Sequence, residues 1–262
     1  FMRPVKWFYV SIININNLSK SYGSNVVLSG VDLKVDSGDA VSIIGSNGAG
    51  KSTLIKCALL LTKPSSGTIE VFGQNILNLS HSALRKTRTE IGVVFQKHNL
   101  VPRLSVLSNV IHGSIGAANN SSLIPFSAMR SWIHATAPES VRRQAMDCLK
   151  RVKLEDFALK RADSLSGGQS QRVAIARALM QKPKLIFADE PAASLDPISG
   201  KAVMDIFFDL CKQENITLVF TSHNVEQALQ YADRVVALKQ GKVSLCDLTN
   251  KLNSEDLLSE YA

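Results

Sequence analysis

A nine-residue loop, "GSNGAGKST" at residues 45–53, is the feature that most constrains how this chain can fold. The apolar run "AVSII" directly before it predicts a buried strand, and "LIKCALLL" directly after it predicts a helix. A strand, a glycine-rich loop and a helix in this order match the phosphate-binding pattern G-x-x-x-x-G-K-[ST]. The fixed positions of that pattern are Gly45, Gly50, Lys51 and Ser52. We therefore expect an α/β fold with a nucleoside triphosphate site at the end of a strand.

The chemistry of this phosphate loop (residues 45–53) follows from its residue types. Glycines let successive backbone N–H groups turn toward one anion, and the helix N-terminus favours negative charge. Lys51 is expected to reach the β- and γ-phosphates, and the Ser52 hydroxyl to complete a Mg²⁺ shell. A glycine-rich turn that merely precedes Lys-Ser is the alternative, and the flanking strand and helix disfavour it. The residues expected to contact the nucleotide are Gly45, Ser46, Asn47, Gly48, Ala49, Gly50, Lys51, Ser52 and Thr53.

Strand-like runs elsewhere in the chain indicate how the domain is organised. They lie at 12–18, 31–35, 40–44, 68–71, 91–95, 185–188, 218–221, 235–238 and 242–245. The early runs and their short turns predict a small antiparallel β layer. From Gly167 onward, strands alternate with helical patterns, which predicts a mostly parallel sheet. The block at about 104–165 has only helical periodicity, so we expect it to be a helical subdomain inserted into the α/β core.

These patterns predict one nucleotide-binding domain over residues 12–248. Residues 1–11 are expected to form an N-terminal extension, and residues 249–262 a C-terminal tail. The polar stretch 115–132 contains Pro125 as a breaker and is interpreted as an exposed excursion. The sequence contains no run of about 18 apolar residues, so no membrane span is predicted. The first residues lack the apolar core of a signal peptide.

Composition excludes some function classes. The 262 residues are 45% hydrophobic, which is enough for a substantial core, and the formal net charge is +8. Nucleic acid, an anionic membrane surface or a phosphate-rich ligand could each explain this charge. The basic residues are scattered, however, so a solvated basic surface is the favoured interpretation and no nucleic acid partner is expected. Free thiols and a reducing compartment are expected from the wide spacing of Cys57, Cys148, Cys211 and Cys246.

Two carboxylates follow the apolar strand in "LIFADE". A parallel strand delivers the side chains after its C-terminal end to the ligand-binding edge of a sheet. Asp189 is therefore expected to hold Mg²⁺ together with Ser52, and Glu190 to orient or deprotonate a water. A strand followed by an ordinary acidic turn is the alternative.

The stretch "LSGGQSQRVAIARAL" supplies a second anion-receptive turn, at Ser166, Gly167 and Gly168, before a helix. One bound nucleotide needs only one phosphate-binding turn. A second such turn in the same chain is therefore expected to contact a nucleotide bound by a partner chain. With the phosphate loop upstream and "ADEP" downstream, this stretch closely resembles the ATP-binding subunits of ABC transporters. The resemblance covers residues from about 12 to about 241.

The resemblance implies roles for further residues. "SKSYG" offers Tyr22 for stacking on adenine, and "VVFQ" offers Gln96 for contact with Mg²⁺, water and the membrane partner. "SLDP" offers Asp196 at the dimer seam, and "FTSH" offers His223 as a γ-phosphate switch. Tyr22 could instead be a surface aromatic, and Gln96 an ordinary polar residue. The histidines without such a context are His81, His98, His112 and His134.

The resemblance also implies partners. Two chains are expected to close head-to-tail, so that Ser166, Gly167, Gly168 and Gln169 of one cap the ATP of the other. A separate transmembrane permease, served indirectly by a solute-binding protein, is expected to hold the dimer at the cytoplasmic face of the inner membrane. A soluble family member acting on ribosomes or DNA is disfavoured, because the chain has one ATPase domain and no sustained heptads.

Residues 93–116 resemble the phosphonate importer subfamily, as do "RADSLSGGQ" and "YADRVVALKQGKV". The chain departs from that subfamily at "TSHN", where Leu-His-Gln is usual, and at Cys246-Asp247, where Phe-Asp-Gly is usual. Because of the resemblance, uptake of a phosphonate is the main hypothesis. Because of the departures, a polar amino-acid or methionine importer is kept as the alternative.

Overall fold

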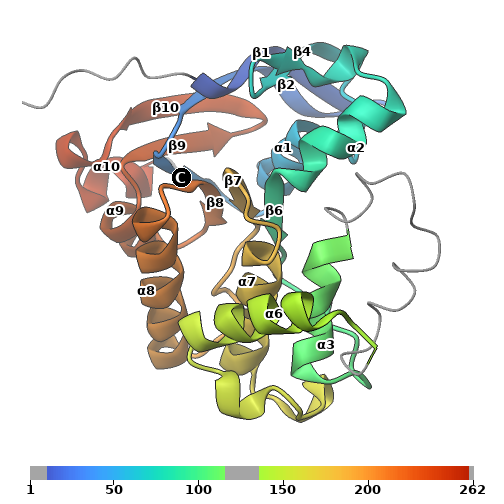
Figure 1. The fold of residues 1–262 in the computed structure, drawn as a ribbon. Coiled ribbons are helices and arrows are strands. Elements are labelled where there is room, and N and C mark those ends of the chain that lie inside the picture. The colour runs from blue at the N-terminus through green and yellow to red at the C-terminus, as the bar shows by residue number, and fades with distance from the viewer. Residues whose placement is uncertain (1–10, 116–135, 260–262) are drawn as a thin grey trace, which may run out of the picture. The chain divides into compact units, whose positions relative to one another are not determined.

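The structure is a computed structural model that describes residues 11–115 and 136–259 (Figure 1). Most of the expected N-terminal extension and of the expected excursion at 115–132 lie outside these ranges, as does His134. The chain divides into two compact units. The first contains residues 1–80 and 223–262, and the second contains residues 81–222.

The first unit contains the small antiparallel layer that the sequence predicts, in the strand order β2-β1-β4-β5. Apolar residues recur along β1, so that Ile13, Ile15 and Leu18 are buried. Its bounds and those of its partners are β1 Ser11–Tyr22, β2 Asn25–Asp36, β4 Ser66–Val71 and β5 Gln74–Asn75. The strands are longer than the sequence runs at 12–18 and 31–35 suggest, because the hairpin continues to its turn, where Tyr22 pairs with Asn25.

The same unit holds β3 (Ala40–Ile44), which pairs in parallel with β9 (Arg234–Lys239). β10 (Lys242–Leu248) runs antiparallel to β9. The strand β3 is almost fully apolar and buried, as expected for a parallel strand covered on both faces. The helices of this unit are α1 Lys51–Ala58, α9 Val225–Tyr231 and α10 Ser254–Ser259, with short 3₁₀ turns at Ile76–Asn78 and Thr249–Lys251.

The helix after the phosphate loop ends earlier than the sequence suggests. "LIKCALLL" predicts a helix to Leu61, but α1 stops at Ala58 and Leu61 is exposed. Leu60 adopts a left-handed conformation, with φ 51°, and the Leu61 N–H donates to the Lys56 carbonyl. This is a helix C-terminal motif that usually uses glycine, so its leucine gave no stop signal in the sequence.

The second unit is built on the parallel strands β6 (Ile91–Val94), β7 (Leu185–Ala188) and β8 (Thr217–Ser222). All four residues of β7 and all six of β8 are buried. The ring of Phe208 on α8 meets that of Phe220 on β8 edge to face, with 5.0 Å between centroids. The helices among the described residues of this unit are α2 His81–Thr89, α3 Val106–Ile111, α6 Glu139–Arg151, α7 Gly167–Leu179 and α8 Pro197–Gln213.

The regular elements described within 104–165 are helical, as the sequence predicts. They are α3 and α6, with 3₁₀ turns at His112–Ser114 after α3 and at Glu155–Phe157 and Ala162–Ser164 after α6. Ala145, Leu149 and Val152 recur at helical spacing along α6 and its C-cap, and all three are buried. Figure 1 shows α6 running across α7 and next to α3. In the part of the chain that the structure describes, no helix is long and apolar enough to cross a membrane.

Candidate functional site

The phosphate loop joins β3 to α1 in a conformation that requires glycine. Gly45, Gly48 and Gly50 have φ values of 148°, 84° and 106°, a region that L side chains rarely adopt. A Cβ at Gly45 would lie 2.2 Å from the Leu238 carbonyl oxygen, and one at Gly50 would lie 2.8 Å from Leu28 Cδ2. The ends of the loop are therefore packed against neighbouring strands, while Ser46, Asn47 and Gly48 form an exposed crest.

Lys51 begins α1 and folds back over this loop. Its ammonium donates to the Gly45 carbonyl over 2.7 Å and to the Ser46 carbonyl over 3.1 Å, and the residue is 5% exposed. A buried ammonium needs such partners, because desolvating an unpaired charge is costly. The lysine is therefore held by the loop's own backbone. Anionic oxygens at the crest would compete with these carbonyls for its donors.

Tyr22 lies at the end of the β1–β2 hairpin and is 48% exposed. The Lys20 ammonium lies over the Tyr22 ring, 4.7 Å from its centroid, and also donates to the Lys63 carbonyl. The hairpin reaches the phosphate loop, because Leu28 and the Val27 carbonyl are the groups that a Cβ on Gly50 would meet. An aromatic ring with a large exposed fraction thus belongs to the strand pair that packs against the loop.

His223 directly follows β8 and has an exposed side chain. It is followed by Asn224, the N-cap of α9, whose side chain accepts from the Gln227 N–H over 3.0 Å. The cap ends the strand and starts the helix within two residues. His223 thus lies at the first residue after the C-terminal end of the strand, as the sequence predicts.

The two carboxylates predicted from "LIFADE" follow β7 in a tight turn, which we call the carboxylate turn (Asp189 and Glu190). The Asp189 N–H donates to the Val94 carbonyl, which continues the β6–β7 pairing by one residue. Glu190 then adopts a left-handed conformation, with φ 49°. A non-glycine residue in this region costs roughly 1–2 kcal/mol, so other contacts must support it.

One such contact comes from Thr221 on β8, a residue to which the sequence gave no role. Its hydroxyl donates to Asp189 Oδ1 over 2.8 Å and accepts from the Glu190 N–H over 2.8 Å. The residue is 0% exposed. The pairing of Ala188 with Phe220 places Thr221 opposite the turn. Because the contact spans about thirty positions of sequence, no local motif could have indicated it.

The glycine turn predicted from "LSGGQ", the signature turn (residues 166–169), begins α7 with a capping box. The Ser166 hydroxyl accepts from the Gln169 N–H, and the Gln169 side chain accepts from the Ser166 N–H. A hydroxyl that accepts in this way keeps its own O–H as a donor. The turn can therefore present that O–H and helix N-terminal N–H groups to an anion.

Asp196 lies close to the signature turn. It caps α8 by accepting from the Ser199 N–H over 3.0 Å, and this bond holds the pKa of the Asp196 carboxyl below its usual range. A Cβ on Gly167 would lie 3.1 Å from Leu195, and one on Gly168 would lie 3.5 Å from Ser199. The two glycines thus allow the starts of α7 and α8 to pack closely, so the structure brings two separately predicted motifs together.

Gln96 is exposed two residues after β6 and lines a pocket of about 580 Å³ with His98, Asp163, Ser170 and Ser194. The pocket therefore joins the segment after β6 to the signature helix α7 and to the segment before Asp196. Burial, and then the nearby Arg177 guanidinium, lowers the pKa of His98.

The segment after Gln96 is held by Arg177 of α7, which the sequence also left without a role. Its guanidinium donates to the His98 carbonyl over 2.8 Å and to the Asn99 carbonyl over 2.7 Å. Burial lowers the pKa of Arg177, which is nevertheless a charged donor at any ordinary pH. Arg177, near the end of α7, thus hydrogen-bonds the backbone of the segment after Gln96.

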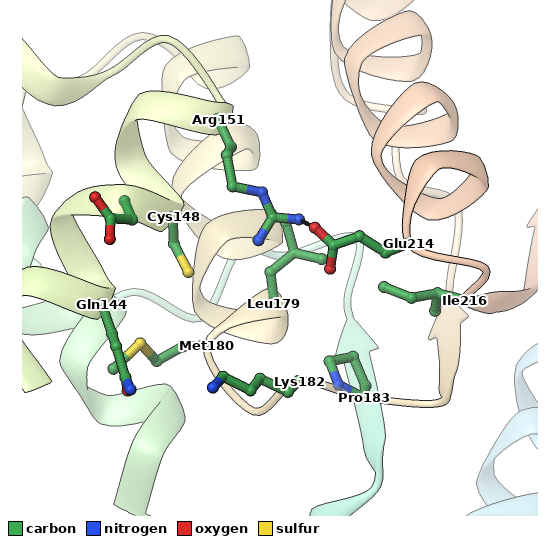
Figure 2. A pocket seen from close by; sticks show the side chains of 10 residues that line it. Gln144, Cys148, Arg151, Leu179, Met180, Lys182, Pro183, Glu214 and Ile216 are labelled. Atoms are coloured by element: carbon green, nitrogen blue, oxygen red, sulfur yellow. Dashed lines mark ion pairs between the residues drawn. The ribbon is translucent and has the colours of Figure 1, made fainter.

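A second pocket, of about 550 Å³, contains none of the predicted site residues (Figure 2). Figure 2 shows Arg151 of α6 pointing toward Glu214, the residue after α8, with which it forms an ion pair. The thiol of Cys148 faces the same space, and burial raises its pKa. No disulfide joins the four cysteines, as predicted, and burial raises the pKa of Cys211 to about 12.

The residues that the sequence predicts as Mg²⁺ ligands carry suitable donor atoms. Within residues 11–115 and 136–259, no group of three or more His, Cys, Asp or Glu side chains could hold a metal by itself. Mg²⁺ does not need one, since it is commonly bound by one or two carboxylates together with substrate phosphates. Ser52, Gln96 and Asp189 carry hard oxygen donors of the right kind. The Asp189 carboxylate accepts a hydrogen bond from the Thr221 hydroxyl.

A phosphate loop that closes on its own lysine, and a buried strand that ends in Asp-Glu, are the features of P-loop nucleotide-binding proteins. The chain belongs to the ABC transporter family, whose family model matches residues 28–193. The resemblance expected from the sequence is therefore confirmed, and so is the α/β fold of an ABC-type ATPase.

Known proteins match nearly the whole chain. It is 42% identical over 253 residues to a phosphonates import ATP-binding protein of Oceanobacillus iheyensis, covering 96% of each chain. It is 41% identical to a phosphate-import ATP-binding protein of Mycolicibacterium smegmatis, covering 99% of this chain and 95% of that one. Among solved structures, the dimeric cassette MJ0796, in a post-hydrolysis state bound to ADP and Pi, matches with a TM-score of 0.76 and 32% identity. That match covers 90% of this chain and 98% of the other.

Proposed function

We propose that this chain is the ATP-hydrolysing subunit of an importer that takes up a phosphonate through a separate membrane permease. The observation that carries the proposal is the match over 96% of the chain to an ATP-binding protein named for phosphonate import. The glycine-dependent backbone of the loop at residues 45–53 supports it. A phosphate importer is the second candidate, because the relative from Mycolicibacterium smegmatis is named for phosphate. Both solutes are tetrahedral phosphorus oxyanions.

In this proposal the phosphate loop and Tyr22 bind the nucleotide. Backbone N–H groups of residues 45–53 would surround the β- and γ-phosphates. The Lys51 ammonium, which two loop carbonyls hold within the loop, would turn to the phosphate oxygens. Tyr22 would stack on adenine through its exposed ring. Ser52, Gln96 and Asp189 would hold Mg²⁺, which when bound neutralises charge that develops on the phosphate oxygens.

Hydrolysis would then depend on positioning and electrostatics. Glu190 would accept a proton from the attacking water, with its backbone fixed by the carboxylate turn. His223, at the C-terminal end of β8, would contact the γ-phosphate. Because charge spreads over the γ-phosphoryl oxygens during transfer, donors in place beforehand lower the barrier without reorganisation.

A second copy of the chain would complete each site. Ser166, Gly167, Gly168 and Gln169 of one copy would cap the ATP of the other, and Asp196 would lie at the seam. The Ser166 hydroxyl supports this role, since it caps its own helix as an acceptor and keeps its O–H for a phosphate. Closure around ATP and release after hydrolysis would drive the attached permease.

The permease would dock near the pocket that contains Gln96. That pocket borders the signature helix and the segment before Asp196, so a partner seated there would affect both. A soluble binding protein would deliver solute on the other side of the membrane. The chain would then be peripheral, at the cytoplasmic face of the inner membrane.

The test is reconstitution of this subunit with its co-purifying permease in liposomes, with the cognate binding protein inside or outside as import requires. ATP hydrolysis is measured with an alkylphosphonate, phosphite, phosphate, methionine or glutamine. We expect stimulation by the phosphonate and not by the amino acids. Stimulation by phosphate alone would favour the second candidate. Stimulation by an amino acid alone would refute both phosphorus substrates while leaving the ATPase roles in place.

A further inference from the structure

The hydroxyl of Thr221 connects the two residues of the carboxylate turn. It donates to Asp189 Oδ1 and accepts from the Glu190 N–H, each over 2.8 Å. A threonine hydroxyl has one hydrogen to donate. Because that hydrogen is directed at a carboxylate, its lone pairs are left to face the amide. The direction of one bond therefore determines the direction of the other, and each bond polarises the other.

The turn requires this support because its backbone is strained. Glu190 has φ 49° and is not glycine, and such residues persist only where their surroundings determine the conformation. Thr221 is fully buried in β8, whose pairing with β7 ends at Ala188 and Phe220. The pairing of β7 with β8 therefore directs the Thr221 hydroxyl toward the carboxylate turn.

We propose that Thr221 is a positioning residue for ATP hydrolysis, which orients the Asp189 carboxylate for Mg²⁺ and holds the backbone of Glu190. The inference rests on the proposed function, which gives Asp189 and Glu190 their roles. Thr221 contacts neither nucleotide nor water in this assignment, and acts through these two residues. It links the metal-binding group and the base through one oxygen, so both should change together when that oxygen is removed.

This assignment predicts effects that a purely structural hydroxyl would not produce. Thr221→Val keeps the volume and the branch at Cβ but removes the donor and the acceptor. Misplacement of a reacting group by about 1 Å can cost about 10²-fold in rate, so we expect kcat to fall roughly 10- to 100-fold. The Mg²⁺ concentration for half-maximal nucleotide binding should rise several-fold. Thr221→Ser keeps the hydroxyl and should restore both quantities.

Thr217→Val is a matched control. Thr217 is also a fully buried threonine of β8, four residues earlier, and it pairs with Leu185 rather than with the turn. Removal of the Thr217 hydroxyl should lower thermal stability about as much as Thr221→Val does. It should leave the Mg²⁺ midpoint unchanged.

The experiment uses the full chain and two measurements. Phosphate release gives kcat, and titration of Mg²⁺ into a fluorescent ATP analogue bound to Glu190→Gln forms, which do not turn over, gives the Mg²⁺ midpoint. A shifted midpoint and reduced kcat in Thr221→Val, rescued by Thr221→Ser and absent in Thr217→Val, are expected. If Thr221→Val does not fold, Thr221→Cys, with a similar volume and a weak S–H donor, should give an intermediate loss.

Equal midpoints and equal kcat values in Thr221→Val and Thr217→Val would overturn the inference. The proposed function fails differently, with no ATP hydrolysis by the wild-type chain or with an undiminished rate in Glu190→Gln. A wild-type chain that hydrolyses ATP beside an unaffected Thr221→Val would therefore refute the role of Thr221 alone.

Discussion

The phosphate loop and the carboxylate turn serve the same proposed reaction but are built in different ways. In the loop, Lys51 bonds to the carbonyls of Gly45 and Ser46, so the hydrogen bonds that hold its charged side chain come from the loop itself. In the turn, Asp189 and Glu190 depend on Thr221, about thirty residues later, and on the Val94 carbonyl, about ninety-five residues earlier. One element is encoded locally, and the other is set by strand pairing.

This difference predicts where substitutions act. Changes inside the loop should affect nucleotide binding directly, because its residues are both scaffold and ligand. Changes around the turn should affect the rate while binding persists, because the turn holds groups that act during hydrolysis.

The largest effect is expected at Glu190. Glu190→Gln should keep ATP binding and lose about 10²–10⁴-fold in kcat, because a positioned base typically contributes that much. Lys51→Ala should instead lose ATP binding, since the loop has no other cation. Phosphate release and binding of a fluorescent ATP analogue separate the two outcomes.

The same variant tests the closed dimer. Without turnover, Glu190→Gln should accumulate as a dimer with ATP and remain largely monomeric without it, as sedimentation would show. A dimer under both conditions would argue against a seam filled by nucleotide. Hydrolysis by Glu190→Gln at the wild-type rate would remove Glu190 from its proposed role.

Features held by near neighbours in the sequence could be predicted, whereas features held by tertiary pairing could not. The strand, glycine loop and helix around residues 45–53 could be predicted from the sequence, because glycine sets the backbone of its own position and apolar runs mark the two flanking elements. The roles of the loop residues toward a nucleotide stay predictions. The signature turn was also predictable, since Ser166 and Gln169 form a capping box three residues apart. Thr221 and Arg177 were missed, because each acts on a segment that only tertiary pairing brings near. The end of α1 was misjudged because Leu60 occupies a position that usually signals itself with glycine.

A smaller effect, on stability as well as binding, is expected at the glycines of the loop. Gly45→Ala would place a Cβ 2.2 Å from the Leu238 carbonyl oxygen, in a backbone region that alanine avoids. Strain of roughly 1–2 kcal/mol and a packing cost of about 1–3 kcal/mol should add. Gly48→Ala carries the strain alone, because nothing lies within 4 Å of its Cβ position. Urea unfolding of both variants measures the difference, and equal losses would contradict the packing argument.

At the signature turn the expected loss is about 1 kcal/mol. Ser166→Ala removes a helix N-cap, which usually costs about 0.5–2 kcal/mol, and also removes the hydroxyl proposed to meet the partner's ATP. Ser166→Asp keeps an N-cap acceptor but replaces the donor with a negative charge. Ser166→Asp should therefore recover stability in thermal unfolding and still fail to form the ATP-dependent dimer in a Glu190→Gln background. Recovery of the dimer by Ser166→Asp would show that the turn acts only through its cap.

The smallest effect is expected at Lys20, which lies over the Tyr22 ring 4.7 Å from its centroid. A cation–π contact at an exposed site contributes about 0.5–1 kcal/mol, so Lys20→Met should weaken ATP binding roughly two- to five-fold by freeing the ring. Tyr22→Ala should weaken it more, because loss of base stacking costs about 1–3 kcal/mol. Lys20→Arg keeps the cation and should bind ATP as the wild type does. Calorimetric titration with tripolyphosphate, which has no base, distinguishes an adenine contact from a change in the phosphate loop. If Lys20→Met weakened tripolyphosphate and ATP equally, the hairpin would act on the loop, and the loop would be less self-contained than its own hydrogen bonds indicate.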